Sequence, residues 1–157
     1  MLEHKYYVCK SSWCICINIL AGYEEYSGYT NVGENSRTIK ITDGLWLRFE
    51  KNPDMQDNIY NYAEAFIKGL CDDYLSYLVK GLKTVQEQII NNSIYKNTVI
   101  IINSLEFSIC DFQEEGLTAA IIEWASKMFK FEPPAINVSF QKEKIYCRKM
   151  QYRHYVM

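Results

Sequence analysis

Adjacent carboxylates are the first residues in this chain whose types and spacing could do chemistry. Three such pairs occur: Glu24 with Glu25, Asp72 with Asp73, and Glu114 with Glu115. A pair of this kind can act as general acid and general base. The last two pairs also fit the first turn of a helix, where free N–H groups and the helix dipole favour negative charge. A helix N-terminus is the simpler explanation for those two, and catalysis is the alternative.

Cysteine and histidine are the other candidates for chemistry. The chain has six cysteines, Cys9, Cys14, Cys16, Cys71, Cys110 and Cys147. They form no Cys-x-x-Cys, most lie among apolar residues, and the only close pair is Cys14 with Cys16. This pattern predicts buried free thiols, with disulfides or a metal site as the alternative. The two histidines, His4 and His154, lie near the termini, which makes a cysteine nucleophile with a histidine base a weak hypothesis.

Motifs for the common enzyme classes do not occur in the sequence. Gly22, Gly28 and Gly33 do not have the spacing of a phosphate-binding loop, and no Lys-Ser/Thr follows them. There is no His-Glu-x-x-His and no Gly-x-Ser-x-Gly. The residue types and spacings therefore predict no convincing active site, and we expect no bound cofactor or metal.

Tyrosines are unusually frequent, with 13 in 157 residues, and three of them recur at every third position beside carboxylates. Rings beside carboxylates are typical of protein interfaces, where the rings are anchors and the charges steer a basic partner. The candidate partner-binding residues are Tyr23, Glu24, Glu25, Tyr26, Tyr29, Asn31, Glu34 and Asn35. The alternatives are rings packed over the edge of a sheet and a pocket for a small ligand.

Positive charge collects near the C-terminus, at Lys142, Lys144, Arg148, Lys149 and Arg153. A charged edge strand protected from aggregation is the simpler interpretation, and RNA binding is the alternative. The whole chain has a formal net charge of −2, which argues against a nucleic-acid binder that relies on phosphate neutralisation.

The elements that must position these residues begin with strands. Residues 6–9 and 13–20 predict extended structure, and apolar residues on both sides of the second segment predict a strand covered on both faces. Residues 21–37 form the longest predicted loop and contain the candidate partner-binding residues. Asp43-Gly44 lies between alternating segments 38–42 and 45–50, which predicts a hairpin.

Two helices are predicted next, at residues 54–70 and 72–91, with one long bent helix as the alternative. A buried strand at 98–102 and a short strand at 105–109 follow. The last predicted helix begins at Asp111, whose spacing to Glu114 is that of a capping box, and is stopped by Pro133 and Pro134. Its apolar face comprises Leu117, Ala120, Ile121, Trp124, Met128 and Phe131. Strands at 136–140 and 145–148 complete the chain.

This order of elements predicts one α+β domain over residues 1–157. We expect a mainly antiparallel sheet with about three helices packed on one face, and a parallel doubly wound sheet is the weaker alternative. A content of 48% hydrophobic residues is enough for one core. The N-terminal residues do not resemble a signal peptide, and no run of about 18 apolar residues predicts a membrane span, so we expect a cytoplasmic protein with no membrane partner.

Two stretches carry a family resemblance. Residues 26–37 (YSGYTNVGENSR), and residues 111–117 (DFQEEGL) continuing through Trp124 to Pro133 and Pro134, resemble small immunity proteins of bacterial polymorphic toxin and contact-dependent growth inhibition systems. The resemblance implies a non-enzymatic cytoplasmic protein that binds one cognate toxin domain and neutralises it. Such toxins are often nucleases with basic grooves, which an acidic, tyrosine-rich surface would suit. A small enzyme using the loop carboxylates or a thiol, and a regulatory adaptor, are the alternatives.

Overall fold

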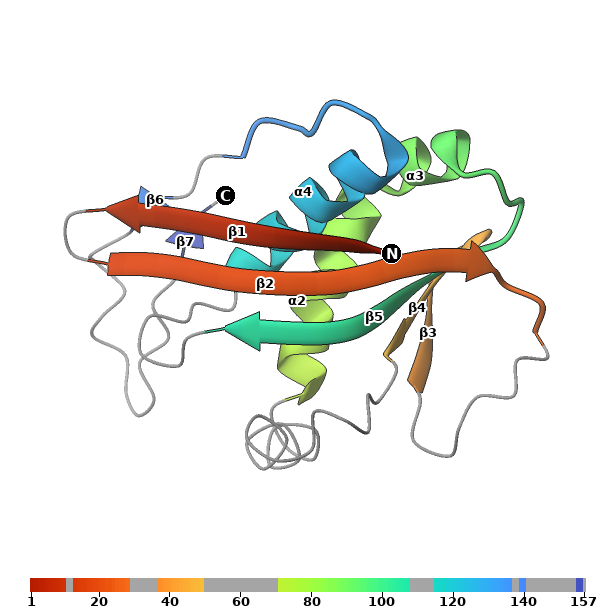
Figure 1. Cartoon of the computed structure of the whole chain (residues 1–157), viewed down its shortest axis with the longest axis horizontal. Coiled ribbons are helices and arrows are strands. Elements are labelled where there is room, and N and C mark those ends of the chain that lie inside the picture. The colour runs from red at the N-terminus through yellow and green to blue at the C-terminus, as the bar shows by residue number, and fades with distance from the viewer. Residues whose placement is uncertain are drawn as a thin grey trace.

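The computed structural model describes residues 1–10, 13–28, 37–49, 71–107, 115–136, 139–140 and 155–156. Within these residues the main sheet has five strands: β1 (Leu2–Lys10), β2 (Trp13–Glu25), β3 (Arg37–Thr42), β4 (Leu45–Phe49) and β5 (Thr98–Phe107). Their order across the sheet is β1-β2-β5-β4-β3, and Figure 1 shows β1, β2 and β5 crossing the molecule side by side. Only the β4–β5 pair is parallel among these neighbours. The sheet is therefore mainly antiparallel, as predicted.

Strand β2 is longer than the sequence predicts. Residues 21–25, predicted as the start of a loop, continue the strand and pair with residues 102–98 of β5. The composition of this segment resembles a loop, but pairing with a buried neighbouring strand overrides that preference. A register shift after Leu20 leaves Asn103 of β5 as an extra residue, so the predicted strands 98–102 and 105–109 join into one bulged strand.

The predicted hairpin at Asp43-Gly44 is confirmed by the antiparallel pairing of β3 with β4. Gly44 has φ of 85°, a left-handed conformation that residues with a Cβ rarely adopt. Its carbonyl oxygen accepts a hydrogen bond from the Thr98 N–H at 2.9 Å, which fixes the hairpin beside the start of β5.

The described helices are α2 (Cys71–Thr84), α3 (Gln86–Asn92) and α4 (Glu115–Phe129). The predicted helix 72–91 is thus two helices. The break lies at Val85, whose φ is −117°, and the Thr84 hydroxyl donates to the Lys80 carbonyl within the last turn before it. The predicted helix 54–70 lies outside the described residues.

Helix α4 ends before the two prolines that were predicted to stop it. Lys130 adopts φ of 58°, and the Phe131 N–H donates to the Ser126 carbonyl at 3.0 Å. The left-handed Lys130 and this hydrogen bond form a C-terminal cap. The helix therefore ends at Phe129, and Phe131 lies beyond it. The predicted cap residue Asp111 lies outside the described residues.

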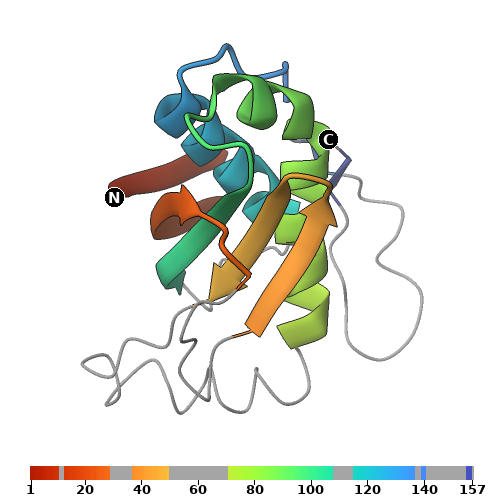
Figure 2. The ribbon, with the colours of Figure 1, turned by 90° about the vertical axis from the view of Figure 1, so that its right-hand side faces the viewer.

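The hydrophobic core lies between the sheet and helices α2 and α4. One face of β2 places Ile15, Ile17 and Ile19 against α4, where Gly116 lets the backbone approach. Trp124 is fully buried and donates from Nε1 to the Leu2 carbonyl at 3.1 Å. Figures 1 and 2 both show α2 and α4 on the same side of the sheet.

The predicted α+β class is confirmed, and a parallel doubly wound sheet is excluded by the antiparallel pairs. The placement of three predicted helices on one face stays a prediction, because residues 54–70 are not among those described. Of the predicted C-terminal strands, the structure describes β6 (Ser139–Phe140), which pairs with β7 (Tyr155–Val156) in a separate two-stranded sheet. Ile136 precedes that strand, and residues 145–148 lie outside the described part.

Candidate partner-binding surface

The candidate residues that the structure describes lie at the C-terminal end of β2. Tyr23, Glu24 and Glu25 belong to the strand, and Tyr26 follows directly. The remaining candidates, Tyr29, Asn31, Glu34 and Asn35, lie outside the described residues. Successive side chains of a strand point to opposite faces, so the four described candidates do not form one continuous surface.

Tyr23 points toward the helices. Its ring centroid lies 4.7 Å from that of Phe129 and 5.9 Å from that of Tyr95. The side chain is half-buried against the hydrophobic core. Tyr23 therefore packs against the core, and its ring lies on the opposite face of the sheet from the ring of Tyr26.

Glu24 lies on the opposite face and forms an ion pair with β4. Its Oε1 accepts from Nη2 of Arg48 at 2.9 Å, and the side chains are 45% and 6% exposed, respectively. The strand register explains this ion pair. Glu24 pairs with Val99 of β5, and Val99 pairs on its other side with Trp46 of β4. Arg48 follows two residues later on the same face of β4.

Tyr26 extends this face with an aromatic contact to Trp46. The two rings are stacked, with centroids 4.2 Å apart and planes inclined by 21°. The Tyr26 N–H donates to the Asn97 carbonyl at 2.8 Å, which fixes the backbone where β2 ends. We call Glu24, Tyr26, Trp46 and Arg48 the β2–β4 cluster.

The electrostatics of this end of the sheet are more balanced than the sequence indicates. Glu24 is neutralised by Arg48, and Asp43 contacts Lys40 at 2.6 Å. A hydrogen bond from Lys40, supported by its positive charge, lowers the pKa of the Asp43 carboxyl. Glu25 is exposed and follows Glu24 on the other face, so these two carboxylates do not converge as a catalytic pair would.

Sequence reasoning missed Trp46 and Arg48 as members of the site. The alternation in the hairpin contains part of the signal, because Leu45 and Leu47 are buried in the core and the residues between and after them must face the other way. The contacts of Trp46 with Tyr26 and of Arg48 with Glu24 depend on the parallel pairing of β4 with β5, a long-range contact with no local signature.

The cysteines differ from the predicted free thiols. Cys9 and Cys14 form a disulfide, with S–S 2.04 Å and Cα–Cα 4.1 Å. The β1–β2 register places them directly opposite each other. Cys16 is free and half-buried; the side chain of Cys71 and all of Cys110 and Cys147 lie outside the described part.

His4 is held by two charged residues of α4. The Lys127 ammonium lies 3.0 Å from Nδ1, and an ammonium can only donate, so Nδ1 is the acceptor. The ring proton therefore lies on Nε2, which donates to Glu123 Oε2 at 3.1 Å. This arrangement anchors β1 to α4. In the described part of the chain, no three His, Cys, Asp or Glu side chains gather where they could hold a metal ion.

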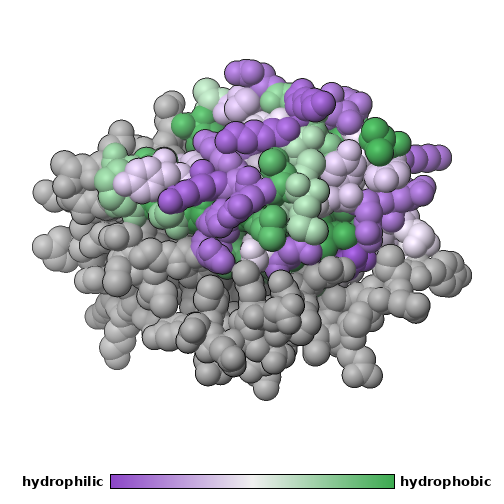
Figure 3. Space-filling view, viewed as in Figure 1, coloured by the Kyte–Doolittle hydropathy of each residue, from purple (hydrophilic) through white to green (hydrophobic). Residues whose placement is uncertain are grey.

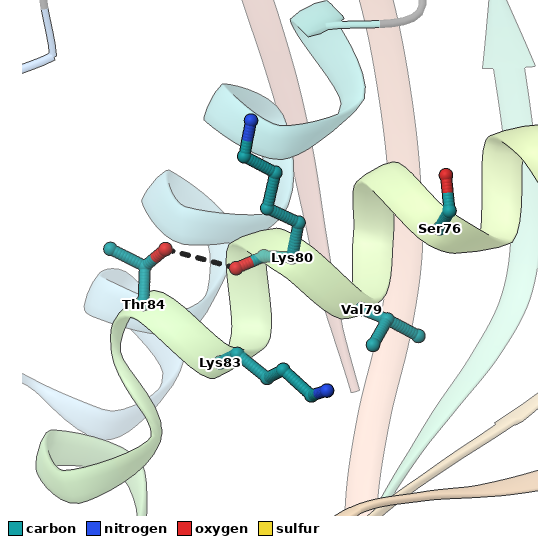
Figure 4. A pocket seen from close by; sticks show the side chains of 5 residues that line it. All are labelled: Ser76, Val79, Lys80, Lys83 and Thr84. Atoms are coloured by element: carbon teal, nitrogen blue, oxygen red, sulfur yellow. Dashed lines mark hydrogen bonds between the residues drawn. The ribbon is translucent and has the colours of Figure 1, made fainter.

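A hollow on helix α2 is a further surface feature lined by polar residues. It measures about 510 Å³, and the described residues that line it are Ser76, Val79, Lys80, Lys83 and Thr84. Figure 4 shows the two lysine side chains pointing apart, and the Thr84 hydroxyl is already bonded to the Lys80 carbonyl. The polar groups do not converge on one point as they would for a small ligand.

Among the described helices, none has both the length and the apolar composition needed to cross a bilayer. Comparisons of the chain with protein-family models, with curated proteins and with solved structures give no match.

Proposed function

We propose that this protein is a cytoplasmic immunity protein that binds a cognate toxin domain through the β2–β4 cluster. The observation that carries the proposal is the stacked Tyr26–Trp46 pair beside the Glu24–Arg48 ion pair. Tyrosine, tryptophan and arginine are the residue types most enriched at energetic centres of protein interfaces. Here all three occur together, at the end of β2 and on β4, the two strands that flank β5.

The geometry also supports rigid binding. Tyr26 and Trp46 are half-buried, so each ring keeps some accessible surface while its neighbour limits its rotation. A side chain ordered before association loses less conformational entropy when the partner binds. Although Arg48 offsets its charge, Glu24 keeps 45% of its side chain exposed, so its carboxylate can still accept a hydrogen bond from a basic side chain of the partner. A nuclease toxin with a basic groove would fit this chemistry.

Coexpression with the product of the open reading frame immediately upstream tests the proposal. We expect a stable complex that restores growth. In that complex, Tyr26→Ala and Trp46→Ala should each weaken binding by about 2 kcal/mol, or roughly 30-fold, because each removes an aromatic anchor. Titration calorimetry on the purified proteins measures the change.

Tyr7→Ala is the matched control. Tyr7 is 60% exposed and lies opposite Cys16 of β2, about 30 Å along the strand from Tyr26 at 3.3 Å per residue. It should leave binding unchanged. A toxic upstream product that the chain neither binds nor neutralises would exclude the immunity function, and equal loss from all three variants would exclude the β2–β4 cluster as its site.

A further inference from the structure

Strand β1 forms one edge of the five-stranded sheet and runs for nine residues. Figure 1 shows it as the outermost strand, and no described strand pairs with its outer side. A long edge presents N–H and C=O groups that can pair with another chain.

The phase of the β1–β2 ladder shows which backbone groups face outward. Directly opposite residues lie about 4.5 Å apart between Cα atoms in a non-hydrogen-bonded pair and about 5.5 Å in a hydrogen-bonded pair. The 4.1 Å separation at Cys9 and Cys14 therefore marks a non-hydrogen-bonded pair. Because the pairs alternate and the register has no shift, the backbone groups of Glu3, Lys5 and Tyr7 point away from β2.

The side chains at these positions are complementary to themselves. In an antiparallel arrangement with a twofold axis at His4, Glu3 of each copy lies opposite Lys5 of the other. The same register places Met1 opposite Tyr7, and these are two of the exposed large hydrophobic residues, at 82% and 60% exposure. Opposite charges and a thioether beside an aromatic ring both stabilise such pairs. A shift by two residues would instead place Lys5 opposite Lys5.

We propose that two copies of this chain associate through their β1 strands in this register and form one continuous ten-stranded sheet. The proposal goes beyond the binding of a toxin and involves strand β1, which contributes no residue to the β2–β4 cluster. Figure 3 shows the molecule from the side of the sheet that faces the viewer in Figure 1, and hydrophilic side chains lie among the hydrophobic ones there. Association therefore depends on the backbone ladder and on paired side chains more than on one large apolar patch.

A charge-reversal cycle measured by sedimentation equilibrium tests this register. Wild-type protein should dimerise. Lys5→Glu and Glu3→Lys should each raise the dimer dissociation constant about 10- to 30-fold, because both symmetry-related ion pairs become like-charge pairs. The double variant, Glu3→Lys with Lys5→Glu, should restore most of the affinity since opposite charges meet again.

Folding of each variant is checked by circular dichroism, because Glu3→Lys also removes the 2.8 Å hydrogen bond that Glu3 accepts from Asn18. Lys83→Glu, an equal charge change at an exposed position of α2, should leave dimerisation unchanged. The proposal is overturned by wild-type protein that stays monomeric at every concentration reached. Dimers insensitive to Lys5→Glu, or single variants that the double variant fails to rescue, overturn it equally.

Discussion

The ionisation of Tyr6 gives a direct test of the packing between β1 and α4. The side chain is 4% exposed, and it faces the core. Burial raises the pKa of the Tyr6 hydroxyl from 10.0 to about 12, and the negative charge of Glu123 adds to the shift. The folded state therefore favours the neutral phenol. Its contribution to stability is complete below pH 10 and is lost as pH rises toward 12.

The magnitude follows from the linkage between proton binding and folding. Two pKa units correspond to about 2.7 kcal/mol. With these pKa values, ionisation of the unfolded chain lowers the free energy of unfolding by about 1.4 kcal/mol at pH 11 and about 2.3 kcal/mol at pH 12. Tyr6→Phe removes this ionisation, so the variant should lose less stability than the wild type over the same range.

Urea unfolding followed by circular dichroism, at about pH 8 and about pH 11, measures the effect as a difference between the two proteins. Comparison at the same pH cancels the titration of groups that both proteins share. Tyr7→Phe is the control, because it removes the same hydroxyl from the neighbouring tyrosine of β1, whose side chain is 60% exposed. Parallel losses in wild type and Tyr6→Phe would refute the argument that Tyr6 is buried beside Glu123.

Two further substitutions test other contacts. Gly81→Ala should lower the free energy of unfolding by about 1 to 3 kcal/mol in a urea titration, because a Cβ would lie 2.8 Å from the Thr118 carbonyl oxygen, although alanine favours helix by about 1 kcal/mol. An increase in stability would show that α2 and α4 are less closely packed. Glu24→Ala should lower the thermal midpoint through a loss of about 1 to 2 kcal/mol, since it removes an acceptor of the buried Arg48 guanidinium; an unchanged midpoint would contradict a structural role for this ion pair.

The hairpin at Asp43-Gly44 and helix α4 were predicted correctly, because both depend on signals within a short stretch of sequence. Asp43-Gly44 predicted its hairpin because the left-handed backbone at Gly44 is encoded by the glycine itself. The apolar periodicity of α4 predicted a buried helix, because the spacing of the apolar residues itself places them on one face. Its end was placed too late, because the left-handed conformation of Lys130 ends the helix before the prolines can.

Features that depend on pairing between distant segments could not be predicted in the same way. The extension of β2 to Glu25 and the position of Arg48 beside Glu24 both require β5, which follows them in the chain. The disulfide is an intermediate case. Once Lys10 is paired with Trp13, Cys9 falls opposite Cys14, so a correct register for the first hairpin would have identified the pair.

The separation of α4 from the strands that it covers has a consequence for synthesis on the ribosome. The β1–β2 hairpin is complete at Glu25, but its apolar face is covered by a helix that ends at Phe129, roughly 100 residues later. At translation rates of about 5 to 20 residues per second, Ile15, Ile17 and Ile19 stay uncovered for on the order of ten seconds. During that interval the nascent chain presents a hydrophobic strand and an unpaired edge together. Chaperone binding to the first 25 residues would protect the chain until α4 emerges and Trp124 can pack beneath Leu2.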